Sequence, residues 1–315
     1  MTSMKASFEA SFLHPRYWTT WLWLGLWRLV SFLPYRLLLV IGKIIGLFLY
    51  SLPTHRKHIA ATNLRVCYPE LDLKAQNALL KANFLSMGIA LMEVGMAWWW
   101  SKKRLAPLLS IEGIEHLDRP ADKSILLLGM HFTTLEIAAA ALNSVIELDG
   151  MYKAHKNPVY EFVQLKGRLN QSVKGCRLLE RNNMRSTMKS LTSGRILWYL
   201  PDQDYGLRQA LYAPFFGIPA ATVYATARFA AKTDAAVVPV TFTRLAGARG
   251  YKITLQPALK DFPTGDDLAD TTRINVIIEA QIRQQPEQYL WVHRRFKNQP
   301  NAEQDIYDKS YIKEQ

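Results

Sequence analysis

The chain begins with a long apolar segment. Residues 17–52 are almost wholly hydrophobic, and only Pro34 and the charged side chains of Arg28, Arg36 and Lys43 interrupt them. About 20 helical residues suffice to cross the ~30 Å hydrocarbon core of a bilayer. We therefore predict a single membrane anchor over 17–52. The alternative is a broken amphipathic hairpin that lies partly in the interface, with its charged side chains reaching toward water.

Two clusters near this segment carry a membrane signal of their own. Residues 98–100 are three consecutive tryptophans followed by a basic turn, which is typical of the lipid headgroup layer. A buried helix end followed by a solvated basic turn would give the same pattern. Directly after the anchor comes a basic flank, which favours the cytoplasmic side for the rest of the chain. It consists of His55, Arg56, Lys57, His58 and Arg65.

Beyond the anchor, short apolar runs alternate with segments of helical spacing. The runs predict strands at 125–130, 151–153, 177–179, 196–200, 236–242 and 251–255, and the helical spacing covers 134–142, 159–169, 184–191, 222–231 and 270–284. Nearly continuous apolar strands indicate a sheet buried on both faces. We expect an α/β fold with a mixed, mostly parallel sheet and helices on both faces. The expected divisions are a polar N-terminus (1–16), the anchor (17–52), a catalytic domain (53–297) and a polar tail (298–315).

The composition narrows the functional classes. Lys and Arg number 39 and Asp and Glu 26, which gives a net charge of +13. Such a chain favours anionic partners, and the apolar N-terminal segment favours a membrane over nucleic acid, for which no binding module is recognisable. Charged residues make up 21% of the chain, too many for a polytopic membrane protein. The two cysteines, Cys67 and Cys176, indicate neither a disulfide framework nor a zinc ribbon.

Candidate chemistry lies where the predicted strands end, because ligands of α/β sheets gather beyond the carboxyl ends of the strands. The polar residues at these points are His131, the segment 201–204 and Arg244. The sequence contains no serine-hydrolase elbow, phosphate loop, dinucleotide fingerprint or zincin motif. No group of histidines has metal-ligand spacing, so we expect neither a metal nor a cofactor.

The leading candidate pair is His131 with Glu136. A neutral imidazole placed just before a helix removes a proton from a hydroxyl, and a carboxylate on its other nitrogen fixes the tautomer and stabilises the imidazolium. The alternative is a capping box over 133–136, in which Glu136 only bonds the first turn of its own helix. Spacing alone leaves both readings open.

Several landmarks occur in the same order as in one known family. HFTTLE (131–136) resembles the HX4D/E signature of the glycerolipid acyltransferase superfamily. The later landmarks are Tyr152 with HKNP (155–158), LPDQ (200–203), PFFG (214–217) with Ala221-Thr222, PEQYLW (286–291) and HRRF (293–296). Together they resemble the bacterial lipid A biosynthesis lauroyl/myristoyl acyltransferases, over nearly the whole chain up to Lys297.

The resemblance implies a late acyltransferase at the bacterial inner membrane, with one N-terminal anchor and its catalytic domain on the cytoplasmic face. It would move a fatty acyl chain from acyl carrier protein, its co-substrate, to the hydroxyl of a hydroxyacyl chain on a Kdo-lipid A precursor. His131 would act as general base and Glu136 would orient it. Arg168, in LKGRLNQ, matches a basic position near the family's active site and is a candidate anion or oxyanion contact; an ordinary solvated helix charge is the alternative.

The resemblance also implies substrate contacts. Lys153 stands where the family often has Arg, which keeps the charge but loses the bidentate fork. Asp202 and Gln203 would hold substrate hydroxyls, although a turn built by Pro and Asp gives the same pattern. The remaining candidates are Arg181 for anions, Phe215 and Phe216 for the acyl chain, and His293, Arg294 and Arg295 for lipid phosphates. Core aromatics and a solvated basic terminus are the corresponding alternatives.

Two rival functions stay open at this point. A lysophospholipid or glycerophosphate acyltransferase shares the HX4 logic but carries an E-G-T-R type motif, where this chain has PDQDYG (201–206). An inert, membrane-anchored lipid-binding module would use Glu136 only as a helix cap.

Overall fold

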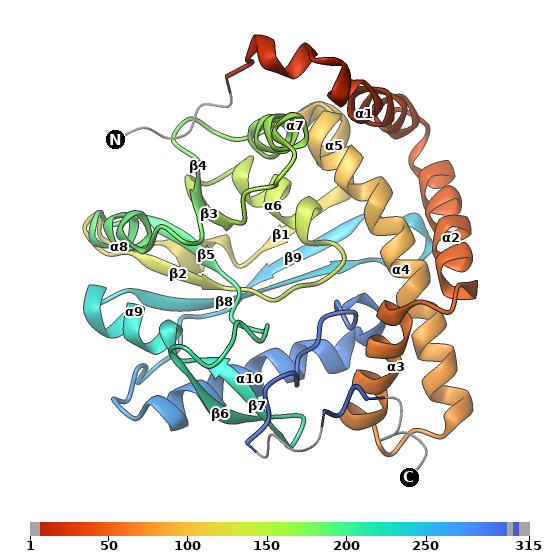
Figure 1. The fold of residues 1–315 in the computed structure, drawn as a ribbon. Coiled ribbons are helices and arrows are strands. Elements are labelled where there is room, and N and C mark those ends of the chain that lie inside the picture. The colour runs from red at the N-terminus through yellow and green to blue at the C-terminus, as the bar shows by residue number, and fades with distance from the viewer. Residues whose placement is uncertain (1–6, 301–304, 309–315) are drawn as a thin grey trace.

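The computed structural model describes residues 7–300 and 305–308. Its core is a seven-stranded sheet in the order β1-β9-β8-β2-β5-β3-β4, joined by a separate β6-β7 hairpin (Figure 1). The strands are β1 Leu109–Glu112, β2 Ile125–Leu128, β3 Leu148–Tyr152, β4 Arg177–Glu180, β5 Ile196–Tyr199, β6 Ala210–Phe215, β7 Ile218–Val223, β8 Ala236–Arg244 and β9 Tyr251–Leu255. Strands β8, β2, β5, β3 and β4 run parallel, and β9 pairs antiparallel with β8. The prediction of a mixed, mostly parallel sheet is confirmed.

Helices cover both faces of this sheet. They are α1 Trp18–Ser31, α2 Tyr35–Ser51, α3 His55–Cys67, α4 Leu73–Trp99, α5 Lys102–Leu105, α6 Leu135–Asn143, α7 Pro158–Leu169, α8 Met184–Thr192, α9 Ala225–Thr233 and α10 Asp267–Gln284. Crossover connections between parallel strands are right-handed, so α6 and α7, which lead outward from β2 to β4, lie on one face. The helices α8 and α9, which lead back to β5 and β8, lie on the other. On the first face α4 packs against α6 and α7.

Residues 17–52 do not form one span. Pro34 separates α1, of 14 residues, from α2, of 17 residues, and each is shorter than the roughly 20 residues that a bilayer requires. Among the described helices, α4 is long and apolar enough to cross a membrane, but 56% of its apolar window is buried inside the protein. Joined as one span, α2 and α3 would also qualify, yet they bend by 90°. The single N-terminal anchor is therefore not confirmed.

Close backbone packing holds α2 against α4. A Cβ atom on Gly88 would stand 2.1 Å from the carbonyl oxygen of Gly42, and one on Gly46 would stand 2.4 Å from that of Phe84. Only glycine permits helices to approach this closely. One face of α2 thus packs against the rest of the protein, while its other face is exposed.

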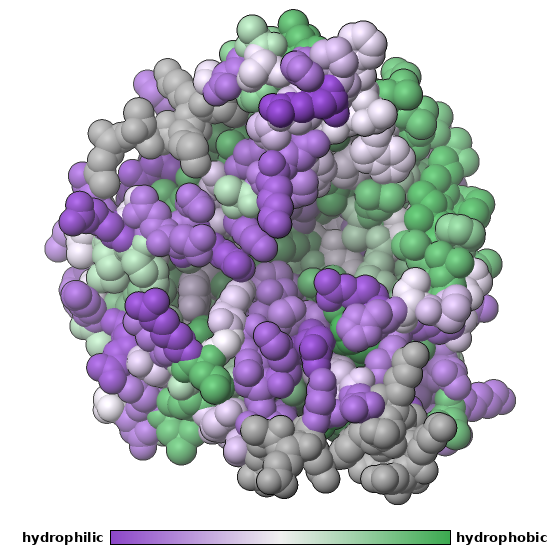
Figure 2. Space-filling view, in the orientation of Figure 1, coloured by the Kyte–Doolittle hydropathy of each residue, from purple (hydrophilic) through white to green (hydrophobic). Residues whose placement is uncertain are grey.

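The open faces of α1 and α2 are strongly apolar. Figure 2 shows hydrophobic residues in a band along the edge of the molecule where α2 lies. Their exposed large side chains are Trp18, Leu22, Trp23, Leu26 and Leu29 on α1, and Leu37, Val40, Ile44, Leu47, Phe48 and Leu49 on α2. A contiguous exposed surface of this kind marks a membrane or protein contact rather than a solvated face.

Several local predictions need correction. The helix expected over 222–231 begins at Ala225, because Thr222 belongs to β7. The β6-β7 hairpin was not predicted. Its two-residue turn has positive φ at Phe216 and Gly217, as a tight hairpin requires. Trp98 and Trp100 are each 2% exposed, so the tryptophan cluster is mainly a buried helix end.

The two chain ends are partly tied to the core. Residues 1–6 of the expected polar N-terminus, and 301–304 and 309–315 of the expected tail, lie outside the described residues. Phe12 is buried against Phe162. Tyr307 is also buried, and its hydroxyl donates to Oδ1 of Asn63 at 2.6 Å. This part of the tail is therefore packed rather than loose.

Candidate active site

The register of two parallel strands brings His131 and Asp202 together. Leu128 of β2 pairs with Tyr199 of β5, and His131 and Asp202 each follow three residues later at the carboxyl edge of the sheet. The imidazole Nδ1 lies 2.7 Å from Oδ1 of Asp202, and the backbone N–H of His131 donates to Oδ2 at 2.8 Å. One carboxylate therefore fixes both the position and the ring orientation of the histidine.

The electrostatics of this pair favour an ionised carboxylate. Asp202 is fully buried. Burial alone would raise its pKa, but the charge and hydrogen bonds of His131 outweigh burial and hold that pKa below its ordinary value. With Nδ1–H directed at Asp202, Nε2 of His131 carries the lone pair of the neutral ring. The side chain of His131 remains 21% exposed, so this nitrogen belongs to a ring that substrate can reach.

The expected pairing of His131 with Glu136 is not what the structure shows. Nε of Arg168 donates to the Glu136 carboxylate at 3.0 and 3.2 Å, and its Nη2 also contacts that group. Nε1 of Trp98 donates to the same carboxylate at 3.0 Å. A spacing of five places the two side chains on different sides of a helix start, and Asp202 takes the role expected of Glu136. The capping-box alternative fails too, because the N-cap residue Thr134 makes no side-chain capping bond.

Arg168 is a half-buried, paired cation rather than a freely solvated one, since its side chain is 21% exposed. Desolvation would lower its pKa, but the charge of Glu136 raises it, so the guanidinium stays charged. Among the described residues, Nη1 of Arg168 has no hydrogen-bond acceptor. The pair thus leaves the Nη1 donors of Arg168 available to a ligand.

A small apolar cavity adjoins this ion pair. Its volume is about 70 Å³, and α6, α7 and strands β3, β4 and β5 form its walls. Glu136, Asn143 and Arg168 provide the polar part of the lining. The apolar part includes Leu135, Ala139, Leu148, Met151, Leu178, Trp198 and Leu200.

The C-terminal segment clamps the loop that carries His131. The N–H of Leu290 donates to the carbonyl of His131 at 2.9 Å, and the N–H of Thr133 donates to that of Gln288 at 2.7 Å. The hydroxyl of Tyr289 donates to the backbone carbonyl of Asp202 at 3.2 Å. The landmark at 286–291 therefore holds both members of the pair.

A buried ion pair supports the same loop. Arg244, which follows the core of β8, donates to both oxygens of Glu93 at 2.6 and 2.7 Å and to Oγ of Ser86 at 2.9 Å. Ser86 in turn lies 2.7 Å from the hydroxyl of Thr133. The position of Arg244 at a strand end had marked it in the sequence as a candidate for the site. Nothing in the sequence linked Glu93 or Trp98, which lie inside the long apolar helix α4, to the site.

The structure revises most of the predicted substrate contacts. Asp202 is wholly buried and bound to His131, so it does not face a substrate. Lys153 and Arg181 are exposed just past β3 and β4, and Gln203 is half-buried beside Asp202. Lys153, Arg181 and Gln203 therefore remain candidates for substrate contacts.

Both aromatic candidates belong to the protein core. Phe215 is fully buried and packs against Phe296, while Phe216 packs against Tyr68 and Trp291. Neither phenylalanine lines the cavity beside Glu136. The core-aromatic alternative therefore describes both rings, which stabilise the β6-β7 hairpin.

The basic C-terminal run is likewise engaged inside the protein. Arg295 is 2% exposed and donates to the carbonyl of Ala221 and the hydroxyl of Thr222. Arg294 pairs with Asp305 at 2.6 Å. Nε2 of His293 accepts the backbone N–H of Asp204 at 3.1 Å, and burial lowers the pKa of this histidine to about 4. The expectation that these cations face lipid phosphates is not supported.

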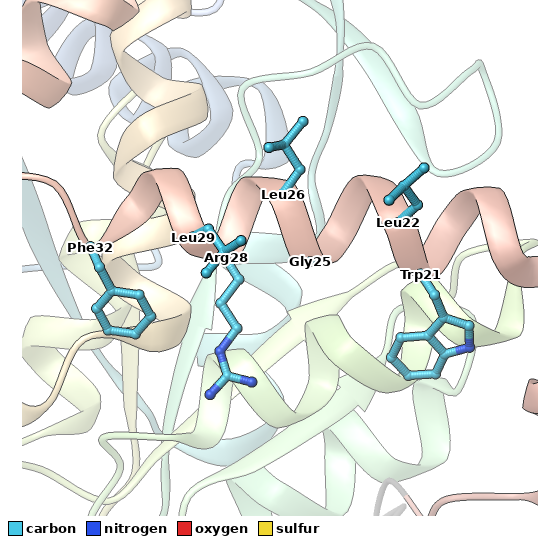
Figure 3. A pocket seen from close by; sticks show the side chains of 7 residues that line it. All are labelled: Trp21, Leu22, Gly25, Leu26, Arg28, Leu29 and Phe32. Carbon is cyan, nitrogen blue, oxygen red and sulfur yellow. The ribbon is translucent and has the colours of Figure 1, made fainter.

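Two further features bear on ligands. Among residues 7–300 and 305–308, no group of three or more His, Cys, Asp or Glu side chains has a metal-binding arrangement. A wide groove of about 700 Å³ runs along α1, away from the carboxyl edge. Figure 3 shows Trp21, Arg28 and Phe32 projecting from one side of α1, and Leu22 and Leu26 from the other.

Comparison with known proteins shows similarity along almost the whole chain. A sequence model of the family described as "Bacterial lipid A biosynthesis acyltransferase" matches residues 5–298. The lipid A biosynthesis palmitoleoyltransferase of Escherichia coli (strain K12) is 36% identical over 307 residues, which cover 96% of this chain and 99% of the relative. The lauroyltransferase of the same strain is also 36% identical, over 94% and 96%. A lipid A biosynthesis acyltransferase of Haemophilus influenzae is 32% identical, over 96% and 97%.

Proposed function

The chain belongs to the bacterial lipid A biosynthesis acyltransferase family, and on this premise we propose the reaction that its carboxyl edge supports. It transfers a fatty acyl chain from acyl carrier protein to the hydroxyl of a hydroxyacyl chain on a Kdo-lipid A precursor. The observation that carries the proposal is the His131–Asp202 pair, a partly exposed imidazole fixed by a buried carboxylate.

The reaction proceeds by direct transfer. Nε2 of His131 takes the proton of the acceptor hydroxyl while its oxygen attacks the thioester carbonyl. The C–O bond forms, the C–S bond breaks, and the leaving thiolate recovers the proton from the imidazolium. Asp202 stabilises that imidazolium through Nδ1. The step balances without an acyl-enzyme or a cofactor.

Negative charge develops on the carbonyl oxygen as the hydroxyl attacks. We assign Nη1 of Arg168 as the donor to this oxygen, held in place because Glu136 binds the rest of the guanidinium. A well-placed donor in a site that excludes water accelerates acyl transfer by roughly 10²- to 10³-fold. Arg168 thereby keeps the role expected of it, and Glu136 acts by positioning Arg168.

The cavity beside this pair is the natural receptor for the donor chain, because its walls are mostly apolar, with Glu136, Asn143 and Arg168 as the polar residues. Its volume, about 70 Å³, is below that of an engineered cavity of ~150 Å³ that binds benzene. The acyl chain must therefore displace lining side chains. The two Escherichia coli relatives at 36% identity transfer, by name, different chains, so overall identity does not decide the length.

The acceptor lipid reaches the site from a membrane. The exposed apolar faces of α1 and α2 bind the membrane surface, with the protein body on the cytoplasmic side. Trp27 of α1 packs 5.5 Å from Trp98, which bonds Glu136. The lipid-facing helix thus lies one side chain away from the ion pair.

Mass spectrometry tests the reaction. Detergent-purified protein is incubated with a Kdo-lipid A precursor and acyl carrier protein loaded with C12, C14 or C16 chains, beside an Arg168→Ala variant. We expect a mass gain of one acyl chain with wild type and a much slower gain with the variant.

Other acceptors separate the rival functions. A gain on glycerophosphate or lysophospholipid, with none on the lipid A precursor, would overturn the proposed acceptor. No gain with any donor or acceptor, together with retained lipid binding, would indicate an inert binding module.

A further inference from the structure

Five exposed basic residues follow the strands at the carboxyl edge. Lys153 and Lys156 follow β3, Arg181 follows β4, Arg185 is the second residue of α8, and Arg208 lies in the loop after β5. We call this set the cationic rim. It borders the side of the sheet from which His131 is exposed.

Backbone pairing and ring contacts place its members together. Tyr152 pairs in register with Glu180, so Lys153 and Arg181 follow neighbouring strands. The N–H of Arg181 donates to the carbonyl of Tyr152 at 2.8 Å. Its guanidinium lies 5.9 Å from the ring of Tyr205, in the loop that carries Arg208.

The rim is not neutralised from within. Among the residues that the structure describes, none of its five cations has a carboxylate within 4.0 Å. Two nearby acids are held by other groups, although they keep their charge: Oε2 of Glu161 accepts the N–H of His155, and Asp204 binds Asn298. Glu180, in β4, is half-buried and pairs with none of the five cations. The rim therefore presents a net positive surface beside the site.

Cations at the opposite edge of the same sheet behave differently. Arg177 and Arg195 both bind Asp149, and Lys123 pairs with Asp234. The five cations of the rim, by contrast, reach solvent without a carboxylate partner among the described residues, at the edge where substrates arrive. Fields of this kind steer acidic partners and raise association rates.

Exposed apolar side chains interleave with the rim. Met184 is 42% exposed, Tyr205 43% and Leu207 58%. Methionine, aromatic residues and arginine are the residue types enriched in protein–protein interfaces. A lipid phosphate needs cations only, whereas this combination fits the surface of a protein.

The end of the rim at Arg185 favours a soluble partner, whereas the end at Lys156 adjoins α1, because the neighbouring Asn157 donates to Thr20 at 2.9 Å. Arg185 belongs to α8, on the face of the sheet opposite α4, α6 and α7, against which α1 and α2 are layered. Figure 1 shows α8 and α9 on the side of the molecule away from α1 and α2. This end of the rim is turned away from the apolar surface that meets the membrane.

We propose that the cationic rim docks an acidic protein that carries the acyl donor to His131. The inference rests on the proposed function, because it assigns the surface that receives the donor of that reaction. The partner's acidic side chains face the five cations, and its apolar contacts cover Met184, Tyr205 and Leu207.

A direct binding measurement tests the rim. Fluorescence anisotropy of labelled acyl carrier protein is measured with full-length enzyme in detergent, at low and high salt. The Arg185→Glu/Arg208→Glu variant should bind roughly tenfold more weakly and lose most of the salt dependence. Its matched control is Lys74→Glu/Lys260→Glu, which reverses one exposed cation at the second position of a helix and one in a loop. The control should bind within about twofold of wild type.

Kinetics distinguish failure of the rim from failure of the reaction. With acyl carrier protein as donor, the rim variant should raise KM about tenfold at nearly unchanged kcat, while the rate with acyl-pantetheine stays within about twofold. Unchanged carrier affinity and KM in the rim variant would overturn the proposal. So would loss of binding to vesicles containing phosphatidylglycerol with unchanged carrier binding, because the cations would then serve the membrane. Absence of transfer by wild type from every donor would refute the proposed reaction. The anisotropy measurement would still show whether the rim binds the carrier protein.

Discussion

Two fully buried aspartates occupy opposite edges of one sheet. At the amino edge, Asp149 binds two permanent cations, Arg177 and Arg195. At the carboxyl edge, both oxygens of Asp202 bind His131, whose ring is partly exposed. In both carboxyls burial raises the pKa and the bound partners lower it, and the net effect is a decrease. The difference lies in the partner, because an arginine cannot release its proton whereas an imidazole exchanges one near neutral pH.

The two aspartates therefore have different roles: Asp149 stabilises the fold, and Asp202 supports the chemistry of His131. Two guanidiniums and the hydroxyl of Ser190 satisfy Asp149, which leaves nothing for a ligand. Asp202 instead fixes a ring whose second nitrogen is left for substrate. The comparison predicts that substitutions at one edge change turnover and that matched substitutions at the other change stability.

The largest expected effect follows from His131→Asn. The amide can still donate to Asp202, so the buried carboxylate keeps a partner, but the base is lost. We expect kcat to fall about 10⁴-fold while the free energy of unfolding changes by less than ~1 kcal/mol. Steady-state transfer assays and urea denaturation measure the two quantities. A variant with nearly wild-type turnover would remove His131 from the chemistry.

The next effect sharpens the contrast directly. Asp202→Asn removes the charge that stabilises the imidazolium and favours the wrong tautomer, so kcat should fall about 10³-fold. Its matched control is Asp149→Asn, which should keep kcat within about twofold. The control should lose about 2–3 kcal/mol of stability, since the two arginines are partly exposed and can rehydrate. Equal kinetic losses in both variants would erase the distinction between the edges.

A smaller kinetic effect is expected at Glu136. The Glu136→Gln variant leaves the half-buried guanidinium of Arg168 without its counter-charge, so kcat/KM should fall roughly 10- to 100-fold. Glu147→Gln removes an exposed carboxylate that pairs with Arg195 at the amino edge, and it should have almost no kinetic effect. If Glu136→Gln were equally silent, the ion pair would be structural only.

The smallest effect concerns acid stability. His293 has a folded-state pKa of about 4, below its ordinary value of 6.5. The unfolded chain therefore binds more protons between these values, and stability falls as the pH is lowered from 6.5 toward 4. Between pH 7 and pH 5 the loss is on the order of 2 kcal/mol. Denaturant titrations of wild type and His293→Gln measure it, and an identical pH dependence in both would contradict the assignment.

The sequence predicted the sheet well for a physical reason. Runs such as 125–130 and 236–242 are apolar at nearly every position, because both faces of their strands are covered. The β6-β7 hairpin escaped prediction because prolines at 214 and 219 interrupt its strands, and its turn depends on positive φ at Phe216 and Gly217. The single anchor is not confirmed, because the apolar segment divides at Pro34 into α1 and α2, a break that its proline already allowed.

The sequence analysis identified the residues of the site, but not which of them pair with each other. His131 and Asp202 lie at the carboxyl edge, and Glu136 in the first turn of α6 pairs with Arg168 from the last turn of α7. Local spacing had instead suggested His131 with Glu136. The true partner comes from the parallel register of β2 and β5, 71 positions along the chain. Sequence proximity cannot reveal such a pairing. For the same reason Arg295, which looked like a surface cation, is buried under the hairpin.

The most direct test of the central claim is a double-variant measurement of the transfer rate. His131→Asn, Asp202→Asn and their combination are compared under single-turnover conditions. If the two residues act as one catalytic unit, the combined variant should be no more than about threefold slower than His131→Asn alone. A further loss close to the full effect of Asp202→Asn in wild type would show that Asp202 acts independently of His131, and would contradict the account.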